Sequence, residues 1–146
     1  MPKITPFLWY DNNQAEEAAN FYVSIFKNSR VIDVTPMVVT FELEGQMFLA
    51  LNGGPEYKFT EAISLYTSCE TQDEVDELWA KLSEGGQEDR CGWLKDRYGL
   101  SWQVIPTVLS ELLNDPDPVK AQRATQAMLG MNKIDIQGLR DAHAGK

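Results

Sequence analysis

The chain offers few side chains that suit nucleophilic or metal-assisted catalysis. Its one histidine is His143, among the last residues of the sequence. Catalysis of the Ser-His-Asp or Cys-His type needs a histidine that a folded core positions, and a histidine-based zinc site needs more than one. The two cysteines, Cys69 and Cys91, form no CxxC pair. We expect two reduced thiols in buried structural roles, with a single disulfide as the alternative.

Besides Glu56 and Tyr66, the adjacent residues Lys95 and Asp96 are weak candidates for acid–base catalysis. They lie in a predicted hairpin, and ionisable groups next to a cleft can transfer protons to and from a substrate. An ion pair within the turn, with no catalytic role, is the alternative interpretation of the same two residues.

Two glycine pairs, at 53–54 and 85–86, are the only candidates for a cofactor-binding loop. Neither belongs to a GxGxxG or GxxxxGK[ST] motif, which the usual dinucleotide and nucleoside-triphosphate loops require. A methyl donor such as S-adenosylmethionine usually binds a glycine-rich loop after a strand of a parallel α/β sheet. We therefore expect these glycines to form a turn and to end a helix, and we predict no cofactor.

The composition is typical of a globular protein with an acidic surface. The 146 residues suit a single domain, and 43% of them are hydrophobic. A net charge of −9 opposes binding to nucleic acids and to anionic membranes. The sequence has no apolar run of about 18 residues and no recognisable secretory signal. We therefore expect a cytoplasmic protein with no membrane span.

Short strands and helices alternate along the chain and must position these residues. Apolar residues at helical spacing predict helices, whereas short aromatic or β-branched runs between turn residues predict strands. The expected strands are 4–10, 31–34, 38–43, 46–51, 62–68, 91–95 and 101–105. The expected helices are 14–27, 72–84, 108–113 and 118–129, with a last helix that Asp135 caps.

The two halves of the sequence repeat the same order of elements. Residues 16–22 align with 73–79, and the turn glycine Gly45 aligns with Gly99. The repeated unit is a strand, a helix and three further strands. One strand of the second unit is poorly marked, because residues 86–90 have low strand propensity. A chance similarity between two strand–helix–strand segments is the alternative.

Several stretches of the chain carry a resemblance to a known family. They are PFLWY, AEEAANFYVSIFKNSR, FELEGQMFLALNGGP, SCETQDEVDELWAKLSEGG, CGWLKDRYGLSWQVIP and AMLGMNKIDI. These stretches resemble the PhnB-like family, which is also labelled the 3-demethylubiquinone-9 3-methyltransferase domain. This resemblance covers nearly all of residues 3–142. The family belongs to the vicinal oxygen chelate, or glyoxalase/bleomycin-resistance, superfamily.

The resemblance implies an α+β fold in which two βαβββ modules place curved mixed sheets around a cleft. Module one would span about 3–55 and module two about 60–106, followed by a helical tail at 107–146, all within one domain. Members of the superfamily commonly form homodimers, often with exchanged modules. Segment 30–39 is shorter here than in the relatives. We expect the shortening to remove part of one cleft wall or to alter the dimer contact.

The resemblance also implies which positions of the chain would hold a metal ion. Enzymes of the superfamily hold a divalent ion with four side chains, typically His and Glu, from the first and last strands of each module. The matching positions here are Phe7, Leu49, Ser64 and Gln103. Three of these are not typical ligands, and Gln103 offers one neutral oxygen, whereas transition metals prefer imidazole, thiolate or carboxylate. We therefore predict no metal site.

Strand alternation from these positions turns Trp9, Ser64, Tyr66 and Gln103 toward the cleft. We predict that these four residues bind a ligand, with core packing as the alternative. The predicted function is metal-free binding of a small hydrophobic or aromatic molecule by a homodimer. The alternative is an enzyme, either a lyase or isomerase of the superfamily or a methyltransferase as the family label states. A structural role for the tail helices is a third hypothesis.

Overall fold

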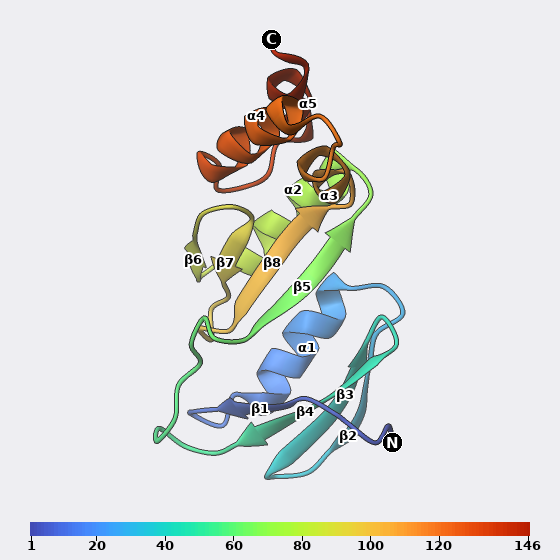
Figure 1. Cartoon of the computed structure of the whole chain (residues 1–146). Helices are drawn as coiled ribbons and strands as arrows, with labels where there is room; N and C mark the ends of the chain where they lie inside the picture. Colours follow the sequence, from blue (N-terminus) through green and yellow to red (C-terminus); the bar gives the residue numbers. More distant parts are fainter. The chain divides into compact units, whose positions relative to one another are not determined.

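A computed structural model describes all residues from 1 to 146, and the chain divides into two compact units, Met1–Phe59 and Thr60–Lys146 (Figure 1). The first unit contains β1 (Phe7–Tyr10), α1 (Ala15–Ile25), β2 (Arg30–Val34), β3 (Val38–Leu43) and β4 (Gln46–Asn52). The second contains β5 (Ser64–Cys69), α2 (Gln72–Ser83), β6 (Gln87–Glu88), β7 (Trp93–Lys95), β8 (Ser101–Pro106), α3 (Val108–Leu113), α4 (Pro118–Leu129) and α5 (Ile136–Ala144).

Each unit builds one open, four-stranded mixed sheet. The strand order is β1-β4-β3-β2 in the first sheet and β5-β8-β7-β6 in the second. In both sheets the first and last strands of the module pair in parallel, and the other pairs are antiparallel. The predicted α+β fold of two βαβββ modules with C-terminal helices is therefore confirmed, and so is the internal repeat.

Helix α1 covers one face of the first sheet. Its buried residues Ala15, Ala18 and Tyr22 recur at helical spacing, and the small alanines allow the helix to lie close to the strands. The ring of Tyr22 packs against that of Phe41 of β3, with the ring centroids 6.1 Å apart. Its hydroxyl lies 2.9 Å from that of Tyr10. The buried tyrosine hydroxyls therefore satisfy each other.

Helix α2 covers one face of the second sheet and anchors β6, the strand whose residues have low strand propensity. Thr71 caps the helix, because its hydroxyl accepts a hydrogen bond from the Glu74 N–H at 3.2 Å. Val75 and Trp79 are buried against the sheet. The indole N–H of Trp79 donates to the Glu88 carboxylate at 2.7 Å. A tertiary contact thus holds the two-residue strand β6 where strand propensity is low.

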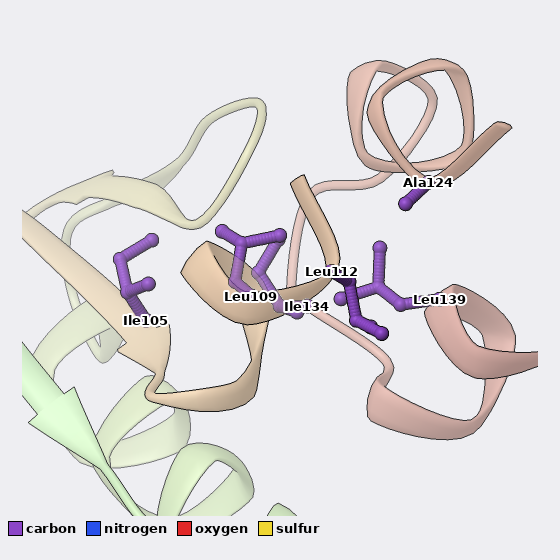
Figure 2. Close-up of a cluster of buried hydrophobic side chains, with 6 residues drawn as sticks. All are labelled: Ile105, Leu109, Leu112, Ala124, Ile134 and Leu139. Atoms are coloured by element: carbon purple, nitrogen blue, oxygen red, sulfur yellow. The ribbon is translucent and has the colours of Figure 1, made fainter. Parts of the chain in front are cut away.

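The tail helices pack on the second unit through a buried apolar cluster, which Figure 2 shows in close-up. The cluster begins on β8 and continues through α3, α4, α5 and the segment before α5. Its buried members are Ile105, Leu109, Leu112, Ala124, Ile134 and Leu139. The tail is therefore part of the second unit rather than a separate appendage.

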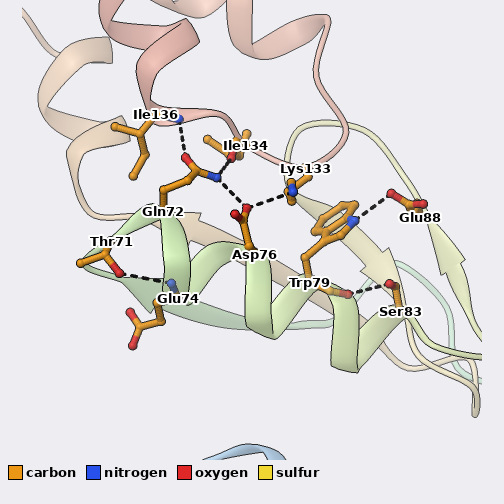
Figure 3. A network of polar contacts seen from close by, with 10 residues as sticks. All are labelled: Thr71, Gln72, Glu74, Asp76, Trp79, Ser83, Glu88, Lys133, Ile134 and Ile136. Atoms are coloured by element: carbon orange, nitrogen blue, oxygen red, sulfur yellow. Dashed lines mark hydrogen bonds and ion pairs between the residues drawn. The ribbon is translucent and has the colours of Figure 1, made fainter.

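A side-chain amide of α2 holds the segment before α5 (Figure 3). The Gln72 side chain donates from Nε2 to the Ile134 carbonyl at 3.0 Å and accepts at Oε1 from the Ile136 N–H at 2.8 Å. Asp76 adds an ion pair with Lys133 at 2.9 Å. One turn of α2 thus fixes the backbone that leads into α5.

Three strands begin later than predicted, and one of them is β5, which starts at Ser64 instead of residue 62. Strand β1 begins at Phe7 instead of residue 4, because Pro6 has no N–H to add to the ladder. Strand β7 begins at Trp93 instead of residue 91, because Cys91 and Gly92 have φ angles of 58° and 83°. These left-handed backbone angles are incompatible with an extended strand. No helix is both long enough and apolar enough to span a membrane.

Candidate functional site

Each sheet has one face that its own helix leaves uncovered. In the first unit we call this the module-one face and define it by Phe7, Trp9, Thr40, Met47 and Leu49. Phe7 pairs with Leu49 and Leu49 with Thr40 across three adjacent strands, so these side chains share one face. Phe7 is 53% exposed. The centre of the module-one face is therefore apolar and aromatic, and an ion pair between Arg30 and Glu42 lies at its edge.

Trp9 is held by the loop that follows β4. Its indole N–H donates to the Gly54 carbonyl at 2.8 Å, and the ring packs edge-on against Tyr57 at a centroid distance of 4.8 Å. A Cβ at Gly53 would collide with the indole ring. The polar tip of Trp9 therefore already has a partner within the chain, and only the ring surface remains for a ligand.

Both glycine pairs have structural explanations. Gly53 makes room for the Trp9 ring, and Gly54 has a φ of 97°. In the second pair, Gly85 has a φ of 76° after α2, and a Cβ at Gly86 would collide with the Lys95 carbonyl. The first loop follows β4, which pairs in parallel with β1, but leads to strand β5 and opens no helix, and the second loop follows a helix. A methyl-donor loop would follow a parallel strand and open a helix. The residues present do not fit an S-adenosylmethionine site of that kind.

The module-two face, which is the helix-free side of the second sheet, carries two rows of side chains. Lys95 pairs with Ser101 and Ser101 with Ser64, which forms a polar row across β7, β8 and β5. The next row on the same strands is Trp93, Gln103 and Tyr66, which places an amide between two aromatic residues. Tyr66 is 58% exposed. Three of the four predicted ligand-binding residues, Ser64, Tyr66 and Gln103, thus lie on one face.

The polar groups of this face are unevenly satisfied. The Gln103 amide donates to the Ser64 hydroxyl at 2.9 Å, whereas the buried Ser101 hydroxyl has no hydrogen-bond partner. The Lys95 ammonium lies 2.8 Å from a carboxylate oxygen of Glu61. Through this hydrogen bond and its charge, Lys95 lowers the pKa of Glu61 below its usual value. Buried hydroxyls in proteins are usually bonded, so the unpartnered Ser101 hydroxyl is an exception.

Asp96 faces away from this row and shapes the hairpin turn. Its carboxylate accepts hydrogen bonds from the Tyr98 N–H at 2.8 Å, the Leu100 N–H at 3.1 Å and the Trp102 indole at 2.9 Å. The residue is 2% exposed. Strand alternation thus separates two neighbours in sequence, because Lys95 reaches the module-two face and Asp96 the interior. An Asp three residues before Gly99 is itself a turn signal.

The residues of the two faces do not fit a divalent metal ion. Phe7 and Leu49 are apolar neighbours in the ladder. Ser64 and Gln103 offer only neutral oxygens, and the Ser64 hydroxyl already accepts a hydrogen bond from Gln103 Nε2. No three His, Cys, Asp or Glu side chains of the chain come together as a metal site. His143 lies in the tail, where its Nε2 is 2.8 Å from Asp115.

The two cysteines are free thiols. Cys69 is buried at the end of β5, and burial, together with the negative charge of Glu74, raises the pKa of its thiol to about 11. The thiolate is the reactive form of cysteine, so Cys69 is unsuited to nucleophilic chemistry. Cys91 lies at the bend before β7, where its N–H donates to the Met131 carbonyl at 2.7 Å.

Sequence reasoning missed two residues of the module-two face. Trp93 is two residues before Lys95 on the same strand, so alternation alone would have placed it there. Glu61 has no such signal, because it lies in the irregular segment before β5 and reaches Lys95 only in the folded chain.

The comparison with known proteins agrees with this geometry. The family model for 3-demethylubiquinone-9 3-methyltransferase matches residues 2–105, and no curated protein matches the chain. A solved structure from Bacillus cereus, provisionally described as a 3-demethylubiquinone-9 3-methyltransferase, PhnB protein, is 35% identical. The match covers 71% of this chain and 99% of that one, with a TM-score of 0.66.

Two less similar structures share the fold. One is the fosfomycin resistance protein FosX from Listeria monocytogenes, solved with Mn(II) and a sulfate ion. It is 15% identical, with a TM-score of 0.57 and coverage of 77% of this chain and 97% of that one. The other is described as a possible glyoxalase from Bacillus cereus. It is 12% identical, with a TM-score of 0.53 and coverage of 72% and 97%.

The family match covers both modules and ends where the tail begins. The repeated βαβββ topology is the feature that the sequence, the structure and these relatives have in common. The chain therefore belongs to the 3-demethylubiquinone-9 3-methyltransferase, or PhnB-like, family and has the α+β fold of the glyoxalase, or vicinal oxygen chelate, superfamily.

Proposed function

We propose that this protein binds a small, planar aromatic molecule on its helix-free sheet faces without using a metal ion. One observation carries the proposal. The module-two face places Tyr66 and Trp93 on either side of the Gln103 amide, next to a row of hydroxyl groups. Small-molecule sites in proteins are mostly apolar, with a few polar groups that orient the ligand.

The exposure of the aromatic side chains supports binding. Tyr66 and Phe7 are both more than half exposed on otherwise ordered sheets. A contiguous exposed apolar patch is typical of a binding surface, and Tyr66 shares a row with the aromatic Trp93 on the module-two face. An aromatic ligand would cover the exposed surface of these rings and add ring–ring contacts of about 0.5–1.5 kcal/mol each. The same faces carry no donor set that a divalent ion prefers.

The proposal places the protein in the cytoplasm as a homodimer that binds a small molecule and neither nucleic acid nor membrane. The net charge of −9 supports the last two exclusions, because it repels phosphate groups. The exposed aromatic residues Phe7 and Tyr66 of the two helix-free faces support the dimer, because association can shield them and their ligand from water.

A binding experiment with a neutral aromatic probe tests the proposal. 2-Naphthamide, titrated into the protein and followed by calorimetry, should bind saturably and raise the melting temperature. At a hundredfold excess over Kd, a ligand that binds only the native state adds about 2.7 kcal/mol of stability. Tyr66→Ala should weaken binding about tenfold, which corresponds to about 1.4 kcal/mol.

Val119→Ala is the matched control, because Val119 is 56% exposed but lies on α4 of the tail. It should leave the affinity for 2-naphthamide unchanged. Absence of saturable binding would refute the proposal. Methyl transfer from S-adenosylmethionine to a quinone by the purified protein, or isomerase turnover of a lactoylglutathione-type substrate, would favour the enzyme alternative.

A further inference from the structure

We infer, on the basis of the proposed function, that the module-two face selects aromatic carboxylates, with Lys95 as the carboxylate-binding cation and Glu61 as an internal occupant that the ligand displaces. Neither Glu61 nor its contact with Lys95 follows from the metal-site pattern of the superfamily. The inference starts from the polar row of Lys95, Ser101 and Ser64 next to the aromatic row.

The ion pair of Lys95 shows where a carboxylate fits. The ammonium nitrogen is 2.8 Å from Oε1 of Glu61, and the Lys95 side chain is 31% exposed. Glu61 is the looser partner, because its side chain is 58% exposed and belongs to the irregular segment before β5. Ion pairs with this degree of exposure contribute little to stability. An incoming carboxylate can therefore replace Glu61 on Lys95 at small cost to the fold.

Ser101 is the second observation that points to a ligand. Its hydroxyl is buried and has no partner, although it lies directly opposite Lys95 in the antiparallel ladder. Directly opposite residues in such a pair have Cβ atoms about 5 Å apart. A carboxylate has two oxygens, and one on Lys95 leaves the other available to a hydroxyl donor of the same row. A neutral aromatic molecule without an acceptor would leave Ser101 unsatisfied.

The spacing of the two rows sets the size of the ligand. Residues two apart on a strand are separated by about 6.6 Å along it. A carboxyl group joined directly to a fused aromatic ring system spans this distance, with its oxygens over the polar row and its rings over Gln103. Trp93 and Tyr66 flank that position on the two neighbouring strands. The occupant is therefore a planar aromatic acid in which the carboxylate is attached directly to the ring system.

The test compares 2-naphthoate with 2-naphthamide, which has the same rings without the charge. Calorimetry at about 0.15 M salt, where the screening length is about 8 Å, limits the effect of the chain's net charge. The wild-type protein should bind 2-naphthoate at least tenfold more tightly than 2-naphthamide. Lys95→Met should remove this preference, because it lowers the affinity for 2-naphthoate at least tenfold. Glu61→Gln should tighten 2-naphthoate binding at least threefold, because it removes the internal competitor.

Lys81 and Glu77 provide matched controls. They form an ion pair of 2.7 Å on the exposed side of α2, so Lys81→Met and Glu77→Gln should change neither affinity. Ser101→Ala should reduce the preference for 2-naphthoate, and circular dichroism verifies that every variant is folded.

The possible outcomes separate the inference from the proposed function. Equal binding of both probes, unaffected by Lys95→Met and Glu61→Gln, would overturn the carboxylate inference and leave aromatic binding in place. Failure of both probes to bind would refute the proposed function itself.

Discussion

Asp96 stabilises the hairpin turn, although it is the neighbour of Lys95 in the sequence. Its carboxylate accepts hydrogen bonds from two backbone N–H groups of the turn and from the Trp102 indole, and it is almost fully buried. Lys95, one residue earlier, reaches the opposite face and pairs with Glu61. At the residue scale, the two ionisable neighbours therefore have separate tasks. One stabilises the hairpin, and the other is available to a ligand.

Asp96→Ala should destabilise the protein by about 3 kcal/mol. The change leaves the Trp102 indole and the Tyr98 and Leu100 N–H groups without their acceptor, and buried donors without partners are costly. Urea denaturation measures the loss in free energy of unfolding. Asp89→Ala is the control, because the Asp89 carboxylate accepts from Arg90 N–H at an exposed site. A loss below about 1 kcal/mol for Asp96→Ala would contradict this role.

The side-chain amide of Gln72 in α2 helps to hold the segment that leads into α5. Gln72 supplies a donor to the Ile134 carbonyl and an acceptor to the Ile136 N–H, just where the chain enters α5 (Figure 3). The buried cluster around Leu139 and Ile134 adds apolar packing (Figure 2). At the element scale, α5 therefore takes its position from α2 and from the cluster together.

Gln72→Ala should loosen the tail while the sheets stay intact. The expected cost is about 1–2 kcal/mol, because two backbone groups lose a partly buried partner. Hydrogen exchange should become faster in α5 and remain unchanged in β3 and β4. Gln137→Ala is the control, because the Gln137 amide bonds only to Asp141 on the exposed side of α5. Unchanged exchange in α5 of Gln72→Ala would rule out this anchoring.

Local signals explain why most elements could be predicted from the sequence. The Glu44-Gly45 turn adopts the left-handed angles that a two-residue hairpin requires, so β3 ends and β4 begins where expected. Contacts between distant segments could not be predicted. The Trp79 indole bonds to Glu88 of β6, and the Gln72 amide bonds to a backbone group more than sixty residues away. No local sequence pattern predicts either contact. Of the candidate site, alternation placed Ser64, Tyr66 and Gln103 on one face.

The two modules share a topology but differ in their helix-free faces. The module-one face is apolar around Phe7 and Leu49, whereas the module-two face adds hydroxyl, amide and ammonium groups to its aromatic residues. The family match stops at residue 105, so the tail lies beyond it. At the scale of the whole molecule, the repeated fold carries one face with an apolar centre and one face that combines aromatic with polar groups, and neither has the donors of a metal site.

Titration of 2-naphthamide with and without metal tests the central claim, metal-independent binding of an aromatic molecule, most directly. The protein is first treated with EDTA, then titrated alone and again after addition of Mn(II). We predict saturable binding with the same Kd, within about twofold, under both conditions, because no donor set on either face prefers a divalent ion. Binding that appears only with Mn(II), or no binding in either titration, would contradict the claim.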